Sequence, residues 1–388
     1  MDCIISTDKE YVAGTYGRFP IALVSGKGSI LKDATGKEYI DMGSGIGVTA
    51  FGTADGQWLE AVTGQLNKLQ HVSNLYYTEP CALLAKALCQ KTGMKKVFFS
   101  NSGAEANECA IKVARKYSAQ KKGANCHTII TLKNSFHGRT LTTLSATGQD
   151  HFHELFQPLT PGFVHVAAGD LEGLKKVVEE IPVAGIMMEV VQGEGGVVPL
   201  GAEFVTAAAA LAKEKDIPLI IDEVQTGNGR TGKLYGYMHF GIEPDIVSTA
   251  KGLGGGLPIG ATLMSEKVQY VLGPGDHGST YGGNPVCCAG ALSVINRLDD
   301  EFLAEVQKKS DYIFSTLSGC KGIKSVTGMG LMIGIKTTKP AKEVVSECMK
   351  RGVLCLTAKD KVRLLPALNI PIDVLSDAID VIKAVCAE

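Results

Sequence analysis

The chain has 388 residues, of which 45% are hydrophobic and 20% are charged, and its formal net charge is −1. This length allows two domains with substantial cores, and the composition is typical of a globular protein. The near-zero charge gives no basis for a nucleic-acid partner or an anionic membrane surface.

The cysteines and the first residues indicate a location. The 11 cysteines are an odd number, are scattered and never occur as Cys-x-x-Cys, which is typical of free thiols in a reducing compartment. Residues 1–11 are polar and lack the apolar core of a signal peptide. No apolar run approaches the roughly 20 residues needed to cross a bilayer. We therefore expect a cytoplasmic protein.

Short β-rich runs alternate with helical patterns through the middle of the chain. The expected strands are residues 97–100, 128–132, 186–191, 219–221, 246–249 and 261–264. The expected helices between several of them are residues 104–117, 171–179 and 203–215. This alternation predicts an α/β fold whose mostly parallel sheet is covered by helices on both faces.

From Gly283 onward the pattern changes to an α+β segment. Two helices, the second ending near residue 317, precede strands at 323–326 and 331–335, a helix at 341–351, short strands and a closing helix. We expect three parts in the chain. Residues 1–49 form an N-terminal arm that contributes to the small domain, 50–285 form the large cofactor-binding domain, and 286–388 form the C-terminal small domain.

One motif suggests a dinucleotide site but lacks the required context. Residues 227–232 match G-x-G-x-x-G, which binds a pyrophosphate only when a helix follows it. Residues 233–244 contain two glycines, a proline and several aromatic residues, so the sequence predicts a loop there. We therefore reject this interpretation.

Two charged residues follow neighbouring expected strands. Asp222 ends the apolar run 218–222, and Lys251 ends the run 245–251 before a glycine-rich turn. Ligands of open parallel sheets bind beyond the carboxyl ends of the strands, which places both side chains at a site. A lysine buried there loses solvation and becomes nucleophilic. Taken singly, either residue could be an ordinary surface or capping residue.

Together the two residues meet the needs of pyridoxal 5'-phosphate. This cofactor requires an amine that forms an imine with it and a carboxylate that keeps its pyridine nitrogen protonated. Its phosphate requires an anion site, and Gly103 and Ala104 begin an expected helix whose first N–H groups are free. The sequence therefore predicts this cofactor, with Lys251 and Asp222 as the catalytic residues.

Eight stretches resemble the class-III pyridoxal-phosphate aminotransferases, in family order and over nearly the whole chain. They are residues 15–20, 101–107, 134–140, 192–196, 222–227, 250–256, 277–285 and 363–366. The resemblance implies aminotransferase fold type I, with a mostly parallel seven-stranded sheet in the large domain and a smaller α+β domain. Residues 53–56 depart from the family, which usually has a turn with His and Pro there, and we expect only local variation.

The resemblance implies how one subunit holds the cofactor ring. Phe136 stacks on one face of the pyridine ring, and Val224 packs against the other. Asp222 pairs with the ring nitrogen, Gln225 lies near the ring hydroxyl oxygen, and Lys251 forms the imine.

The resemblance also implies how the phosphate is bound and that two subunits share each site. Gly103 and Ala104 donate backbone N–H groups to the phosphate. Thr280 binds the phosphate of the partner subunit's cofactor, and Ser279 lies at the substrate. The expected assembly is therefore a homodimer with shared active sites.

Three further residues are implied to bind substrate carboxylates. Glutamate has one carboxylate beside the reacting carbon and one distant from it, whereas acetylornithine, which reacts at its terminal amine, has only the distant one. Arg139 fits the shared distant carboxylate, and Arg363 fits the one that only glutamate carries. Glu194 would neutralise Arg363 when acetylornithine is bound and swing away for glutamate.

Within this class, the motifs are most similar to those of enzymes that transfer the terminal amine of N2-acetylornithine to 2-oxoglutarate in arginine biosynthesis. Ornithine, succinylornithine, 4-aminobutyrate and succinyldiaminopimelate remain alternative amino donors. An aminomutase or a racemase would keep Lys251 and Asp222 but would not need both arginines. The intact pair of Lys251 and its acid partner argues against a non-catalytic binding protein.

Overall fold

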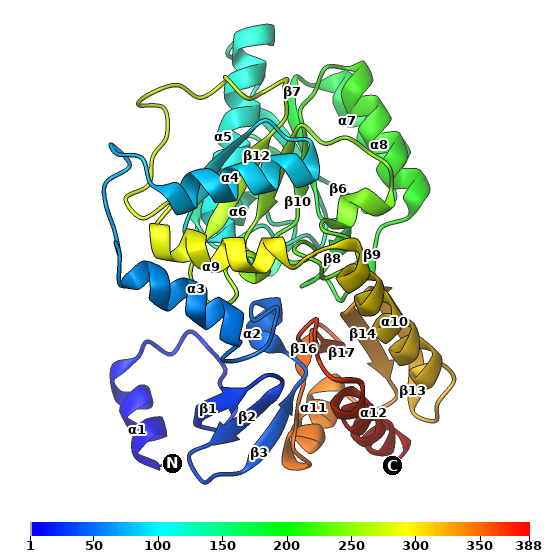
Figure 1. Cartoon of the computed structure of the whole chain (residues 1–388). Coiled ribbons are helices and arrows are strands. Elements are labelled where there is room, and N and C mark those ends of the chain that lie inside the picture. The colour runs from blue at the N-terminus through cyan, green and yellow to red at the C-terminus, as the bar shows by residue number, and fades with distance from the viewer. Residues whose placement is uncertain (1) are drawn as a thin grey trace.

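A computed structural model describes residues 2–388 of the chain, and its largest element is a seven-stranded sheet in the upper part of Figure 1. The strands, in spatial order, are β4 (Lys96–Ser100), β12 (Gly260–Met264), β11 (Ile246–Thr249), β10 (Leu219–Asp222), β7 (Val183–Met188), β5 (Thr128–Leu132) and β6 (Phe163–Val166). β12 runs antiparallel to both of its neighbours, and the pairs from β11 to β6 are parallel. The expected mostly parallel, seven-stranded sheet is therefore confirmed.

Two strands of this sheet differ from the sequence prediction. The pattern does not predict β6, and the strand expected at residues 186–191 is displaced, because β7 ends at Met188 and the chain leaves the sheet at Glu189. Val190 and Val191 are fully buried beyond the end of that strand. The apolar run thus reflects burial against other elements, which sequence periodicity does not distinguish from a strand.

The two faces of the sheet belong to separate apolar layers. Ile220 and Ile246 pack in the layer that includes α5, whereas Ile221 and Val247 pack in the layer on the opposite face. Since successive side chains of a strand point to opposite faces, both faces of this sheet are covered. The helices of this part are α3 (Gly56–Leu66), α4 (Glu79–Thr92), α5 (Gly103–Lys122), α6 (Leu141–Ala146), α7 (Leu171–Glu180), α8 (Ala202–Glu214) and α9 (Pro285–Asn296).

The lower part of Figure 1 holds both ends of the chain. β1 (Leu23–Lys27), β2 (Ile30–Asp33) and β3 (Glu38–Asp41) are antiparallel, and β15 (Val353–Leu354) pairs with β3 in parallel. A second sheet has the order β13 (Ile323–Met329), β14 (Met332–Thr337), β17 (Lys361–Leu364), β16 (Leu356–Ala358) and is antiparallel. α9 packs against α3 and α4. The division at residues 49/50 and 285/286 stays a prediction.

The remaining elements are short or lie around these sheets. They are α1 (Asp2–Tyr11), α2 (Ser44–Gly47), η1 (Asp150–Phe152), β8 (Val191–Gln192), β9 (Val198–Pro199), η2 (Gly236–His239), η3 (Lys251–Leu253), α10 (Asp300–Leu317), α11 (Ala341–Lys350) and α12 (Ile372–Ala387). The expected loop at residues 233–244 contains only the short turn η2, so the dinucleotide motif has no helix after it. Among the helices of residues 2–388, none is both long and apolar enough to cross a membrane.

Candidate functional site

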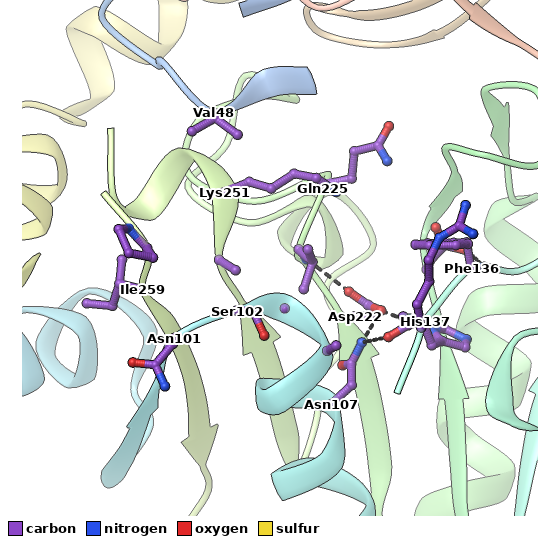
Figure 2. Close-up of a pocket in the computed structure, with 18 of the residues that line it drawn as sticks. Val48, Asn101, Ser102, Asn107, Phe136, His137, Asp222, Gln225, Lys251 and Ile259 are labelled. Carbon is purple, nitrogen blue, oxygen red and sulfur yellow. Dashed lines mark hydrogen bonds and ion pairs between the residues drawn. The ribbon is translucent and has the colours of Figure 1, made fainter. Parts of the chain in front are cut away.

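A cavity of about 480 Å³ opens where the central strands β10 and β11 end. Its walls come from those strand ends, from the first turn of α5 and from the loop after β5 (Figure 2). The cavity brings together eight of the residues that the sequence singled out: Gly103, Ala104, Phe136, Arg139, Asp222, Val224, Gln225 and Lys251.

Asp222 is the last residue of β10 and is buried. Its Oδ2 accepts a hydrogen bond from Asn107 Nδ2 at 2.7 Å and lies 2.8 Å from His137 Nδ1, and its Oδ1 accepts from Val224 N at 2.9 Å. Because an ionised carboxylate only accepts hydrogen bonds, we assign the proton of the histidine to Nδ1. Figure 2 shows these contacts, which fix the direction of the carboxylate.

Lys251 comes from the strand beside Asp222. β10 and β11 are parallel, and Asp222 is in register with Ser248, three residues before the lysine. Lys251 has a left-handed φ of 46°, which turns the chain from β11 into η3. Burial lowers the pKa of its amine, although the charges of Asp222 and Glu194 oppose this effect. A lowered pKa leaves more of the amine neutral and therefore nucleophilic.

The first turn of α5 forms another wall. The Ser102 side chain caps the helix by accepting a hydrogen bond from Glu105 N at 3.2 Å. The N–H groups of Gly103 and Ala104 have no partner inside the helix, so they remain available to an anion at its positive end. A Cβ on Gly103 would lie 2.6 Å from Val224 Cγ1, and only glycine allows Val224 to pack against this turn.

Arg363, on β17, lies outside the lining but is joined to it through Gln225. Its Nη1 donates to Glu194 Oε1 at 2.6 Å and to Gln225 Oε1 at 3.1 Å. The arginine side chain is 4% exposed, whereas that of Glu194 is 32% exposed. The carboxylate therefore neutralises a buried cation while itself keeping access to solvent.

The structure does not bring Ser279 and Thr280 to this cavity. Ser279 Oγ accepts hydrogen bonds from Asn101 Nδ2 at 3.1 Å and from Gly282 N at 2.9 Å. Thr280 is exposed in the loop that precedes α9. Within one subunit, neither residue lines the cavity.

Five polar residues of the cavity wall were not singled out from the sequence: Asn101, Ser102, Asn107, His137 and Glu189. Asn107 follows Gly103 by four residues, so helical spacing places it on the same face of α5, and this signal could have found it. Glu189 is buried, and its Oε2 accepts from Phe136 N at 3.0 Å while its Oε1 accepts from Gly193 N at 3.4 Å. Burial raises the pKa of Glu189 to about 7.

Known proteins resemble this chain along its full length. The family model "Aminotransferase class-III" matches residues 11–386. The acetylornithine aminotransferase of Haemophilus ducreyi is 51% identical over 389 residues, covering 100% of this chain and 99% of that protein. The acetylornithine aminotransferase of Aquifex aeolicus is 44% identical over 377 residues, covering 97% of this chain and 99% of that protein.

Solved structures show the same fold. The N-acetylornithine aminotransferase of Stenotrophomonas maltophilia superposes with a TM-score of 0.85 at 32% identity, covering 99% of this chain and 98% of the other. The ornithine aminotransferase of Toxoplasma gondii superposes with a TM-score of 0.94 at 29% identity, covering 99% and 94%. Because the family match extends over nearly the whole chain and the relatives align along almost their full length, this chain belongs to the class-III aminotransferases.

Proposed function

We propose that the enzyme transfers the terminal amine of N2-acetylornithine to 2-oxoglutarate and thereby serves arginine biosynthesis. The observation that carries this proposal is the unequal state of two arginines. Arg139 is exposed and has no ion pair among residues 2–388, whereas Arg363 is buried against Glu194. This arrangement suits one substrate with a single carboxylate and another with two. The 51% identity to the Haemophilus ducreyi protein supports the same substrate.

Class-III aminotransferases use pyridoxal 5'-phosphate, and the residues of the cavity fit this cofactor. The buried carboxylate of Asp222 would hold the ring nitrogen, and the amine of Lys251 would hold the aldehyde carbon. The free N–H groups at Gly103 and Ala104 would hold the phosphate. When bound, the cofactor supplies an electron sink for the carbon that carries the amine.

The remaining cavity residues would orient the ring. Phe136 and Val224 supply apolar surfaces for its two faces, and the Gln225 side chain supplies a polar group near its hydroxyl oxygen. Asn107 and His137 both contact Oδ2 of Asp222, so the direction of this carboxylate does not depend on the ligand.

Lys251 is the proposed proton carrier. Its Nζ removes the proton from the carbon that bears the amine and holds it until the next transfer. The lowered pKa of this amine favours the neutral form, which is the form that accepts a proton. The charges of Asp222 and Glu194 counteract part of this shift.

Arg139, Arg363 and Glu194 would select the substrates. The guanidinium of Arg139 would bind the distant carboxylate that both amino donors share. Arg363 would bind the second carboxylate, which only glutamate and 2-oxoglutarate place beside the reacting carbon. With acetylornithine bound, Glu194 stays on Arg363, because a buried arginine without a partner costs several kcal/mol.

We further propose a homodimer in which Thr280 of one subunit completes the neighbouring site and Ser279 lies at the substrate. The exposure of Thr280 outside its own cavity supports this assembly. Tyr76, Tyr77 and Tyr281 are also exposed, at 68%, 105% and 62%, and such large exposed side chains are typical of an interface. Mixing Lys251→Ala and Thr280→Ala subunits should restore activity at hybrid sites. No recovery in a confirmed heterodimer would contradict the shared site.

We also propose a cytoplasmic location. All 11 cysteines are free thiols, and several are buried in the core. Free thiols persist in a reducing compartment, which supports this proposal. Fractionation of cells that produce the protein would test it, and recovery outside the cytosol would contradict it.

A panel of amino donors with 2-oxoglutarate as the acceptor tests the proposed substrate. The donors are acetylornithine, succinylornithine, ornithine, 4-aminobutyrate and succinyldiaminopimelate, and glutamate formation gives kcat/KM for each. Acetylornithine should have the highest value. A higher value for free ornithine, the substrate named for the Toxoplasma gondii protein, would replace the proposal with that activity.

A further inference from the structure

Two aromatic rings contact the guanidinium of Arg139, and no acidic group among residues 2–388 forms an ion pair with it. Its Cζ lies 4.7 Å from the centroid of the Phe152 ring and 5.6 Å from that of Phe136. The two rings are 5.9 Å apart and inclined at 65°. Within residues 2–388, the side chain of Arg139 makes no hydrogen bond and no ion pair. The contacts that orient the guanidinium are therefore the two aromatic rings and not a hydrogen bond or an ion pair.

The short turn η1 holds Phe152 in place from both sides. Before it, the buried Gln149 donates from Nε2 to Ser135 O at 3.0 Å, next to Phe136 in the chain. After it, His153 Nε2 lies 2.8 Å from Leu144 O on α6. Phe152 itself is half-buried. The ring therefore keeps a defined position relative to the loop that carries Arg139.

An aromatic partner orients an arginine differently from an acidic one. The ring face attracts the cation through its quadrupole but accepts none of the five N–H donors in the usual hydrogen-bonding directions. A carboxylate partner would occupy two of those donors and would have to be displaced by each incoming substrate. The aromatic contacts thus restrict the orientation of Arg139 while leaving its fork open to a carboxylate.

We propose that Phe152 is a positioning residue that determines specificity for the distant carboxylate. With Phe136, it holds the Arg139 guanidinium ready for a bidentate pair, and it thereby selects amino donors that carry a carboxylate several atoms from the reacting amine. This inference deepens the proposed function and rests on the role that it assigns to Arg139. Phe136 is also proposed to stack on the cofactor ring. Phe152 is therefore the ring whose substitution alters the contact with Arg139 without altering that stacking.

The test compares two donors that differ only in the carboxylate. N-acetylputrescine is acetylornithine without its carboxylate, so it cannot use Arg139. In the holoenzyme, Phe152→Leu should raise KM for acetylornithine about fivefold, which corresponds to about 1 kcal/mol, and leave kcat within about twofold. N-acetylputrescine should respond to the variant by less than about twofold. Phe152→Tyr keeps the ring and should restore the wild-type KM.

Calorimetric binding of glutarate gives a readout that needs no turnover. Glutarate has two carboxylates and no amine, and Phe152→Leu should weaken its binding to the holoenzyme by a similar factor. Phe156→Leu, which alters an exposed aromatic residue four positions along the same loop, is the matched control and should change neither measurement.

The possible failures are distinguishable. Equal effects of Phe152→Leu on both donors, or no rescue by Phe152→Tyr, would overturn the positioning role. If the wild-type enzyme does not turn over acetylornithine, the proposed substrate is wrong. Even then, unchanged glutarate binding in Phe152→Leu would show that Phe152 does not hold Arg139 for a carboxylate, because this measurement needs no turnover.

Discussion

Arg139 and Arg363 are the same residue type in one site, yet the fold holds them in opposite ways. Arg139 is exposed, is contacted by two aromatic rings and keeps its donors free. Arg363 is buried on β17 and is paired with Glu194 and Gln225. An arginine that serves every substrate gains from free donors, whereas one that serves only some substrates needs a removable counter-charge. The comparison therefore supports the proposed roles, in which Arg139 would bind the carboxylate that both substrates share and Arg363 would bind the one that only glutamate carries.

The largest expected effect removes the chemistry that both arginines serve. Lys251→Ala should lower the rate of either half-reaction by about 10⁴-fold, because no other group in the cavity offers a neutral amine. Single-turnover absorbance of the bound cofactor with each donor measures this loss. Lys233→Ala, at an exposed lysine, is the control and should retain full activity. Turnover near the wild-type rate in Lys251→Ala would disprove its catalytic role.

The next test removes Arg363, the arginine that is proposed to bind only glutamate. Arg363→Ala should raise the activation free energy of the glutamate half-reaction by about 2–5 kcal/mol. This is the cost of losing a charge-assisted pair in a partly desolvated site. The acetylornithine half-reaction should lose far less. Arg139→Ala should instead impair both half-reactions. Single-turnover rates with each donor distinguish the two patterns, and equal losses in Arg363→Ala would leave that arginine with a structural role only.

Glu189 lies between the surroundings of the two arginines. It accepts a hydrogen bond from Phe136 N, in the loop that carries Arg139, and another from Gly193 N, beside Glu194. Burial raises its pKa from 4.5 to about 7 in the folded protein. The folded state therefore retains a proton that the unfolded state releases between these values, and this group lowers stability as pH rises through that window. Above pH 7 the penalty, up to about 3 kcal/mol, is complete.

Glu189→Gln removes this titration while keeping an acceptor for Phe136 N. Relative to the wild type, the variant should become more stable as pH rises from about 4 to about 8. Urea unfolding at several pH values measures the difference in the free energy of unfolding. A difference that does not change with pH would show that Glu189 titrates at its ordinary value.

The smallest effect is expected at Glu194, the residue that neutralises Arg363. Glu194→Ala should weaken the acetylornithine half-reaction by about 1–2 kcal/mol, since Arg363 loses its partner but Glu194 is partly exposed to solvent. The glutamate half-reaction should be unchanged or faster, because the substrate carboxylate no longer has to displace Glu194 from Arg363. Ratios of single-turnover rates measure the shift, and Glu203→Ala at the surface is the control. A loss confined to glutamate would contradict the switch.

Much of the fold followed from local patterns. The strands expected at residues 219–221 and 246–249 are β10 and β11, and α5 begins at Gly103, one residue before the expected start. Strand β7 was predicted only in part: it ends at Met188 and not at residue 191, because the buried Val190 and Val191 extend the apolar run beyond its end. Apolarity reports burial, and only the packed structure tells whether the burial occurs inside a sheet.

The contacts of the site depended on parts of the chain that are distant in sequence. Asn107 reaches Asp222 across 115 residues, and Glu194 reaches Arg363 across 169. No periodicity relates such positions, so the hydrogen bonds on Asp222 and the buried state of Glu189 could not be predicted. Phe152 appears in the sequence as an ordinary aromatic residue, and only its distance to Arg139 singles it out.

The sequence by itself determined the chemistry of this protein: a lysine and an aspartate at the ends of successive strands, a helix start for an anion, and two arginines with one glutamate. These features depend on residue type, strand ends and local spacing, which the chain carries without its tertiary structure. The tertiary structure decided which arginine is free and which is paired. That outcome depends on burial and on long-range packing, because a buried charge must find a partner and an exposed one need not.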